Sequence, residues 1–258
     1  MLTDALYRET GAERFLLGCK KIRTECNGDG FRISFTPGKK DLSGSPAVEP
    51  GGKQTIEANR VIITTGSHSL PDLLPGIGPA EMERLTNLRY ARVIEVVLGF
   101  KRWKGMDPDG FGGLIPYREQ RDLLGVLFPS AFLEGRAPGG GALFTLFIGG
   151  IRRPELFELA DDEIRQIVSR EFTDLMGIDR FSPDLFRIFR YRYAIPQYEI
   201  NSGDRFRTVE KIENEYPGLY LRGNFQGGIG LADRIRQGRI AADEIIRSEG
   251  PDAAFVSS

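Results

Sequence analysis

The feature that most constrains the fold is a glycine-rich segment near the C-terminus. Residues 218–233 read Gly-Leu-Tyr-Leu-Arg-Gly-Asn-Phe-Gln-Gly-Gly-Ile-Gly-Leu-Ala-Asp. The pattern predicts a short strand, a glycine turn and a helix from Leu231 to about Arg247. Glycine has no side chain, so the backbone of such a turn can approach a ligand closely. A helix that begins at the turn directs its free N–H groups toward it, which suits a phosphate or another anionic group.

The spacing departs from the dinucleotide-binding pattern Gly-x-Gly-x-x-Gly. Gly228 and Gly230 fit the first two positions, but Asp233 stands where the third glycine belongs. Two interpretations therefore stay open from the residues alone. The segment is a ligand-binding turn, or its glycines serve only a tight connection between strand and helix.

The rest of the chain mixes strands and helices without regular βαβ alternation, which favours an α+β fold. Residues 61–65 form a short apolar, β-branched run, typical of a strand buried on both faces. Residues 161–176 form the clearest amphipathic helix, with an acidic first turn and Gly177 closing it. Further strands are expected at 15–24, 31–35, 90–100, 113–115, 123–129, 142–149, 185–194 and 218–221, and further helices at 2–11, 79–85 and 206–215.

Two connecting segments have clear turn signals. Residues 27–30, Asn-Gly-Asp-Gly, predict a hairpin turn between the strands on either side. Residues 37–53 are rich in Gly, Pro and Ser, which predicts a surface loop.

Charge and composition exclude several classes of function. The net charge of -1 gives no electrostatic reason to expect nucleic acid as a partner. Two cysteines and the single histidine, His68, are too few for a structural zinc site or a disulfide framework, so we expect reduced thiols and no metal. No apolar run reaches the ~20 residues of a membrane span, and the N-terminus lacks a signal-peptide pattern. We expect a cytoplasmic protein, at most peripheral to a membrane.

Several stretches resemble the protoporphyrinogen oxidases and the related coproporphyrinogen oxidases of the flavin amine oxidase superfamily. Residues 223–225, Gly227, Gly230 and residues 231–233 are similar to the closing flavin motif of that family. Other similar stretches follow in the family's order: 61–66 with His68, 90–100, 110–112, 135–138, 149–156 and 194–198. The resemblance covers nearly the whole chain except the loop at 37–53.

The resemblance implies an FAD enzyme that dehydrogenates a porphyrinogen to a porphyrin in haem biosynthesis. The flavin takes a hydride from the substrate and dioxygen reoxidises it, so the cofactor rather than a catalytic side chain carries the chemistry. We expect pieces of an FAD-binding α/β domain at 1–66 and 216–248. A mixed-sheet substrate domain is expected at 67–215, and a flexible tail at 249–258.

The resemblance also implies a set of site residues. The strand around Cys19 would border the adenine, residues 64–66 would lie against the cofactor, and Asn224 would lie by the ribityl–pyrophosphate portion. The expected cofactor-binding residues are Cys19, Thr64, Thr65, Gly66, Gly223, Asn224, Gly230, Leu231 and Ala232. Phe100, Ile195 and Tyr198 would line the porphyrinogen pocket.

For several residues a second interpretation stays open. Asn224 could instead cap a turn, and His68 could have a structural or surface role. Arg136 and Arg152 could meet substrate propionates or simply belong to the surface. The aromatic run at 186–193 alternates as a strand does, which favours packing on a sheet face over a pocket wall.

The chain also departs from the family. Residues 201–202 are Asn-Ser where a Gly-His pair is usual, Gly66 replaces a proline, and Arg234 replaces a cysteine. Family members begin with a strand, Gly-x-Gly-x-x-Gly and a helix, and this chain has no such unit. Without that unit the strands at 61–65 and 219–221 would have unpaired edges.

We therefore expect a truncated or split gene, whose product pairs with a separate N-terminal half that carries Gly-x-Gly-x-x-Gly. Two alternatives stay open: a flavin amine oxidase-like enzyme for another substrate, and an inactive truncated remnant.

Overall fold

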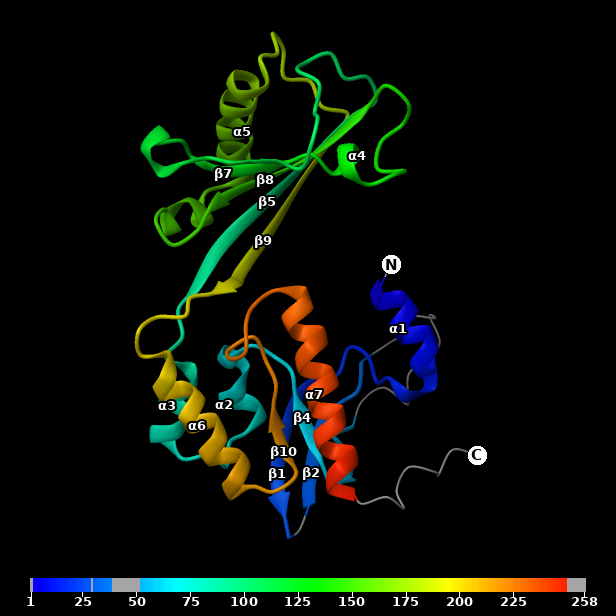
Figure 1. The fold of residues 1–258 in the computed structure, drawn as a ribbon, viewed down its shortest axis with the longest axis vertical. Helices are drawn as coiled ribbons and strands as arrows, with labels where there is room; N and C mark the ends of the chain where they lie inside the picture. Colours follow the sequence, from blue (N-terminus) through cyan, green and yellow to red (C-terminus); the bar gives the residue numbers. More distant parts are fainter. Residues whose placement is uncertain (1, 29, 39–51, 250–258) are drawn as a thin grey trace. The chain divides into compact units, whose positions relative to one another are not determined.

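The computed structural model describes residues 2–28, 30–38 and 52–249 (Figure 1). The chain forms two compact units, each described here by itself. Unit 1 comprises residues 1–88 and 198–258, and unit 2 comprises residues 89–197. No helix in the described ranges combines the length and the apolar character that crossing a membrane requires.

Unit 1 contains two small sheets. β1 (Lys20–Asn27), β2 (Gly30–Thr36) and β3 (Gln54–Ala58) form an antiparallel sheet in that order. Asn27 pairs with Gly30, which confirms the predicted hairpin, although β1 begins at Lys20 and not at Phe15. The second sheet is a parallel pair of β4 (Val61–Ile63) and β10 (Leu219–Leu221), which brings two segments far apart in the sequence side by side.

Strand β4 differs from the sequence prediction of a strand buried on both faces. It spans only three residues, and its Ile62 side chain is 45% exposed whereas Ile63 is buried. The β-branched run gives the extended conformation, but a two-stranded sheet is too narrow to cover both faces of its strands.

The helices of unit 1 surround these sheets (Figure 1). They are α1 (Leu2–Thr10), α2 (Leu70–Leu73), α3 (Pro79–Thr86), α6 (Ser202–Glu215) and α7 (Leu231–Glu249), with 3-10 turns η1 (Ala12–Arg14) and η2 (Ser67–Ser69). The predicted helices at 2–11, 79–85, 206–215 and 231–247 are all confirmed within a few residues at each end. Helix α7 is joined to the parallel pair by hydrogen bonds from Arg60 to Ser248 and from Arg222 to Glu244.

Unit 2 is built on one five-stranded sheet. Its strands are β5 (Tyr90–Phe100), β6 (Gly112–Leu114), β7 (Leu123–Leu127), β8 (Ala142–Gly149) and β9 (Leu185–Pro196). They lie in the order β6-β7-β8-β5-β9, and every one of these pairings is antiparallel. This corrects the mixed sheet expected for the substrate domain, because the parallel pairing lies in unit 1.

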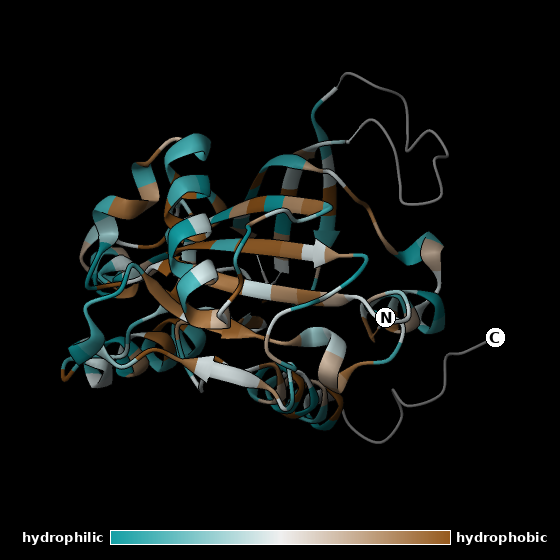
Figure 2. Cartoon of the chain, turned by 90° about the horizontal axis from the view of Figure 1, so that it is seen from above, coloured by the Kyte–Doolittle hydropathy of each residue, from teal (hydrophilic) through white to brown (hydrophobic). Residues whose placement is uncertain are grey.

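Helix α5 (Asp161–Met176) covers one face of this sheet as the periodicity predicted. Its buried stripe is Ile164, Val168, Phe172 and Met176, and Gly177 ends it in the left-handed conformation at φ 59°. Phe172 packs against Phe100 and Phe144 of the sheet, with ring centroids 5.9 and 5.0 Å apart. Figure 2 shows both teal and brown on the helices, as expected for amphipathic helices, and long brown stretches on several strands. The remaining turns are α4 (Pro129–Phe132), η3 (Tyr117–Glu119) and η4 (Pro154–Glu158).

The boundaries of the units differ from the domain boundaries expected after residues 66 and 215. The units divide at 88/89 and 197/198, because α3 and α6 pack on each other and Lys211 binds Glu81 at 2.7 Å. The roles assigned to the domains, cofactor binding and substrate binding, stay predictions. The expected tail lies outside the described residues except for Glu249, which ends α7.

Candidate functional site

Arg234 organises the glycine turn from inside. Its guanidinium donates to the Gly223 carbonyl at 2.6 Å and to the Gln226 carbonyl at 3.0 Å. It also donates to the Gly228 carbonyl and, at 2.7 Å, to Gln237 Oε1. One cation thus joins three carbonyls of the turn to the first turns of α7. Sequence reasoning noted Arg234 only as a departure from the family pattern, because nothing in the spacing shows where its side chain points.

The start of α7 is partly capped by its own chain. Asp233 Oδ2 accepts a hydrogen bond from the Gly230 N–H at 3.1 Å, and Asp233 Oδ1 accepts one from Arg236 at 2.8 Å. A flavin that accepted a hydrogen bond from the Gly230 N–H, as predicted, would compete with the Asp233 carboxylate for this donor. Leu231 and Ala232, also predicted contacts, follow at the exposed start of the helix.

Tyr198 holds the other side of the turn. Its hydroxyl lies 2.9 Å from the Asn224 carbonyl and 3.1 Å from the Gly228 carbonyl. Gly227 and Gly228 have φ of 67° and 102°, values that favour glycine. Tyr198, predicted to line the substrate pocket, is here a support of the segment that contains the predicted cofactor residue Asn224.

Gly223 brings the glycine turn against the end of β4. A Cβ atom at Gly223 would lie 2.1 Å from the Thr65 carbonyl oxygen, so only glycine fits this approach. Two predicted cofactor residues from distant parts of the sequence are therefore neighbours in the fold.

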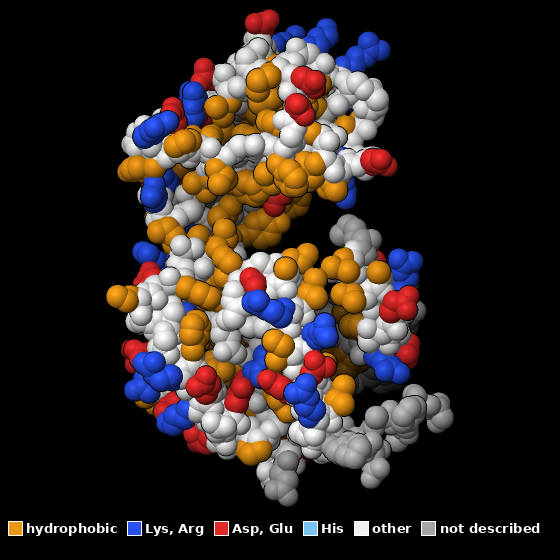
Figure 3. All heavy atoms as spheres, viewed as in Figure 1, with side chains coloured by type: hydrophobic (Ala, Val, Ile, Leu, Met, Phe, Trp, Pro, Cys, Tyr) orange, Lys and Arg blue, Asp and Glu red, His pale blue; other side chains and the backbone are white. Residues whose placement is uncertain are grey.

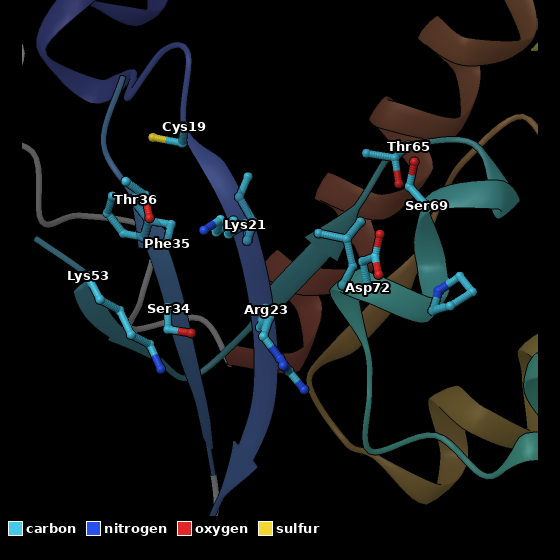
Figure 4. Close-up of a pocket in the computed structure, with 13 residues that line it drawn as sticks. Cys19, Lys21, Arg23, Ser34, Phe35, Thr36, Lys53, Thr65, Ser69 and Asp72 are labelled. Atoms are coloured by element: carbon cyan, nitrogen blue, oxygen red, sulfur yellow. The ribbon is translucent and has the colours of Figure 1, made fainter. Parts of the chain in front are cut away.

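A cavity of about 930 Å³ lies in unit 1 between β1 and the segment that follows β4 (Figure 4). Cationic side chains Lys21, Arg23 and Lys53 line it together with Asp72. The hydroxyl-bearing residues Ser34, Thr36, Thr65 and Ser69 and the thiol of Cys19 complete its polar lining. With three cations against one carboxylate, the lining suits an anionic ligand.

This cavity brings together two of the predicted cofactor residues, Cys19 and Thr65. Thr64 and Gly66 flank Thr65 in the chain but do not line the cavity, and neither does the glycine turn. The three cations were missed by sequence reasoning, because Lys21 and Arg23 alternate along β1 like solvent-facing residues of any strand. His68 lies in η2, and partial burial lowers its pKa below the usual value of 6.5.

The predicted substrate residues of unit 2 have different surroundings. Phe100 is only 7% exposed and belongs to the core under α5, where it contacts Trp103 and Phe172. This burial departs from the predicted pocket wall, because its side chain faces the helix-covered side of the sheet. Ile195 is 44% exposed at the end of β9. Of the two arginines considered for substrate binding, Arg152 lies over the Tyr117 ring at 4.3 Å, and Arg136 is exposed.

The second face of the unit 2 sheet, opposite α5, carries several large apolar side chains. Pairing places Leu114, Gly125, Phe147, Glu95 and Phe189 in one row across all five strands. The next row consists of Leu127, Thr145, Val97 and Arg187. Leu114 is 84% exposed, and Phe189, Tyr191 and Tyr193 are each nearly half exposed. Figure 3 shows apolar side chains gathered over this unit. The alternation along β9 predicted a sheet face, and we name these residues the open face.

Two features of the open face are polar. Glu95 carries a carboxylate, and burial, followed by this negative charge, raises the pKa of the neighbouring Tyr191. Arg187 lies two residues before Phe189 on β9, so its side chain is on the same face of the sheet. The open face can therefore contact a large apolar ligand and still offer one charge of each sign.

Comparison with known proteins identifies the family. Residues 1–246 match the family described as flavin containing amine oxidoreductase. The chain belongs to this family. The match extends over both units, so it covers the cavity, the glycine turn and the open face together.

Two relatives indicate where in the family the chain lies. It is 30% identical over 200 residues to protoporphyrinogen oxidase 2, chloroplastic/mitochondrial, of Arabidopsis thaliana, covering 75% of this chain and 39% of the relative. It is 26% identical over 194 residues to coproporphyrinogen III oxidase of Bacillus subtilis, covering 74% of this chain and 41% of the relative.

The fold is shared with solved amine oxidases as well. Cyclohexylamine oxidase from Brevibacterium oxydans superposes with a TM-score of 0.64 over 94% of this chain and 51% of that one, at 14% identity. At that identity the likeness concerns the fold alone. The chain spans about half the length of the solved structure and less than half of the two relatives.

Proposed function

We propose that this chain is the C-terminal portion of an FAD-dependent oxidase that dehydrogenates a porphyrinogen to a porphyrin, with oxygen as acceptor. The support comes from the family match and from two relatives named for porphyrinogen oxidation. When bound, FAD accepts a hydride from the substrate and passes the electrons to dioxygen. The residues of this chain bind, orient and shield the reactants.

The observation that carries the cofactor assignment is the polar cavity of unit 1. Cys19 and Thr65 line it, and Lys21, Arg23 and Lys53 supply the positive charge that a diphosphate needs. Its volume of about 930 Å³ lies within the range of small-molecule sites. The residues present thus fit the nucleotide end of FAD.

The glycine turn would serve the flavin end. Arg234 and Tyr198 fix the carbonyls of the turn, so the N–H groups of Leu231 and Ala232 at the start of α7 hold constant positions. A helix of nineteen residues presents partial positive charge at this end, which favours an anionic ring edge. Asn224 would contact the chain that links ring and diphosphate.

The open face of unit 2 is the surface we assign to the substrate. A porphyrinogen is a large apolar macrocycle with carboxylate side chains. The open face offers exposed Phe189 and Tyr191 on the same strand as Arg187, and exposed Leu114 at the opposite edge of the sheet. Apolar contact would supply most of the affinity and the arginine would orient a propionate.

The rest of the cofactor site is proposed to come from a separate polypeptide that carries Gly-x-Gly-x-x-Gly. The chain spans 39% and 41% of the two relatives, so their remaining length is available for such a unit.

A second candidate function is oxidation of an amine. The family description, flavin containing amine oxidoreductase, supports it, and Glu95 on the open face could pair with an ammonium group. An inactive remnant that keeps only the fold is the third outcome.

Co-expression with the reading frame upstream, followed by a substrate panel, tests the proposal. We expect a yellow complex that releases peroxide with protoporphyrinogen or coproporphyrinogen and not with amines. Peroxide release with amines alone would favour the second candidate, and a colourless complex that still binds porphyrin would favour the remnant.

A further inference from the structure

Glu95 is the one carboxylate among the described strand residues that point to the open face. It lies on β5 between two phenylalanines, because Phe147 of β8 and Phe189 of β9 are its paired neighbours. Val93 and Val97 precede and follow it on the same face, since side chains alternate along a strand. Glu95 itself is half-buried. A charged group is therefore held among apolar side chains on the surface that we assign to the substrate.

No lysine or arginine of the described residues forms an ion pair with Glu95. Arg190 of the adjacent strand points to the α5 side of the sheet, where it pairs with Asp161. The polar neighbour of Glu95 is Tyr191: burial, then the negative charge of Glu95, then a hydrogen bond from the tyrosine hydroxyl to that carboxylate, raise the pKa of Tyr191. An ionised carboxylate has about four acceptor sites, so one hydroxyl leaves most of them to a ligand.

A ligand that covers the open face removes water from this carboxylate. Burying an ionised carboxylate is costly unless the ligand brings a cation or hydrogen-bond donors to it. A flat apolar ligand without accessible donors is therefore disfavoured at Glu95, although the apolar side chains around it would attract such a ligand. Glu95 thus selects among apolar ligands according to the donors that they present.

The reduced and the oxidised macrocycle differ in these donors. A porphyrinogen has four pyrrole N–H groups and tetrahedral methylene bridges, so its rings can tilt and direct several N–H groups toward one carboxylate. A porphyrin is conjugated and planar, and its two remaining N–H groups lie in the ring plane and point to the centre of the macrocycle. N–H donors and an ionised acceptor form the stronger class of hydrogen bond. A carboxylate that lies against the face of the macrocycle is therefore matched by the porphyrinogen and not by the porphyrin.

The extent of the open face favours a macrocycle over a small ammonium compound. The row that contains Glu95 crosses all five strands, from Leu114 on β6 to Phe189 on β9. At the usual spacing of neighbouring strands, this row is about 19 Å long. An alkyl ammonium ion would cover a small part of the row and leave its large exposed apolar side chains in water.

We propose that Glu95 is a specificity-determining residue that accepts hydrogen bonds from the pyrrole N–H groups of a porphyrinogen and thereby favours the reduced substrate over the oxidised product. This inference rests on the proposed function, which assigns the open face to the substrate. Tyr191 would orient the carboxylate, and the apolar neighbours would contact the pyrrole rings. A porphyrin formed on the open face would lose its hydrogen bonds to Glu95, which favours its release.

Anaerobic isothermal titration calorimetry of the full chain with coproporphyrinogen and with coproporphyrin tests the proposal. We expect wild type to bind the porphyrinogen more tightly. Glu95→Gln should reduce this preference by about tenfold or more, because the amide keeps the shape of the side chain but loses its charge. Glu95→Asp keeps the charge and should keep most of the preference. The control is Asp162→Asn on α5, which removes an exposed carboxylate from the covered side of the sheet and should leave the preference unchanged.

Each variant is scored by the ratio of its two affinities, so a loss of folded protein affects both titrations alike. An unchanged preference in Glu95→Gln, or equal affinity of wild type for both macrocycles, would overturn the inference and leave the proposed function standing. Binding of cyclohexylammonium that is lost in Glu95→Gln would also overturn it, because the carboxylate would then serve an amine. If wild type binds neither macrocycle, the inference fails together with the assignment of the open face to the substrate.

Discussion

Arg234 is the residue on which the glycine turn depends most. Its guanidinium donates hydrogen bonds to the carbonyls of Gly223, Gln226 and Gly228. Without the Arg234 side chain, these three carbonyls would lose that donor. Neighbouring Arg236 forms an ion pair with Asp233 on the same helix, and its side chain is 65% exposed. The two arginines thus differ in environment while sharing charge and helix.

We predict that Arg234→Ala lowers the free energy of unfolding by roughly 2–4 kcal/mol, because charge-assisted hydrogen bonds are lost and acceptors remain unsatisfied. Arg236→Ala should cost less than about 1 kcal/mol, as expected for an exposed pair. Urea unfolding of both variants is the measurement. Equal effects would show that Arg234 does not organise the turn.

Gly223 provides the second residue-scale prediction. Gly223→Ala should destabilise the chain by at least about 1–3 kcal/mol, because its Cβ would meet the Thr65 carbonyl and the turn would be pushed away from β4. The control is Gly238→Ala in α7, where a Cβ meets nothing within 4 Å. That change should stabilise the chain by about 0.5–1 kcal/mol through helix propensity. Thermal unfolding that ranks the two in the opposite order would contradict the placement of Gly223.

At the scale of elements, the packing of α3 on α6 includes the ion pair of Glu81 and Lys211. The hydrogen bond from Lys211 lowers the pKa of Glu81 below its usual 4.5. A carboxyl with a lowered pKa in the folded state contributes stability above its unfolded pKa and loses it as the pH falls.

We therefore expect the melting temperature to fall as the pH drops below about 4.5, with part of this slope removed in Glu81→Gln. Glu210→Gln, which removes an exposed carboxylate of α6 in the groove shared with α7, serves as the control for the loss of one negative charge. A wild-type slope in Glu81→Gln would mean that this pair does not contribute to acid sensitivity.

The elements that the sequence predicted well are long and periodic. β5, β8 and α5 have the predicted bounds, because alternation or helical spacing continues over eight or more residues and a glycine or charge marks the ends. β3 was missed, since Gln54–Ala58 contains a single large apolar residue after a loop-like segment. For β4, the exposure of Ile62 depends on the width of the sheet, which a local pattern does not report.

For the candidate site, sequence reasoning found segments but not their neighbours. It placed Cys19 and Thr65 near a cofactor, and the fold brings both to one cavity, yet Lys21, Arg23 and Lys53 were recognised only in three dimensions. Phe100 lies in the core under α5, a placement that the sequence could not give because strand alternation does not tell which face the helix covers. The site as a whole stays a prediction.

At the scale of the whole molecule, the chain belongs to a flavin enzyme family. It spans about half the length of the solved cyclohexylamine oxidase. The two units of the chain each have a defined architecture. We propose that catalysis requires a complex to which this chain contributes the glycine turn, the polar cavity and the open face.

Anaerobic mixing of the yellow complex with protoporphyrinogen and, separately, with cyclohexylamine tests this account most directly. We predict that protoporphyrinogen removes the absorbance of the oxidised flavin, that admitting oxygen restores it with peroxide formed, and that cyclohexylamine leaves it unchanged. Loss of flavin absorbance with cyclohexylamine and not with protoporphyrinogen or coproporphyrinogen would contradict it.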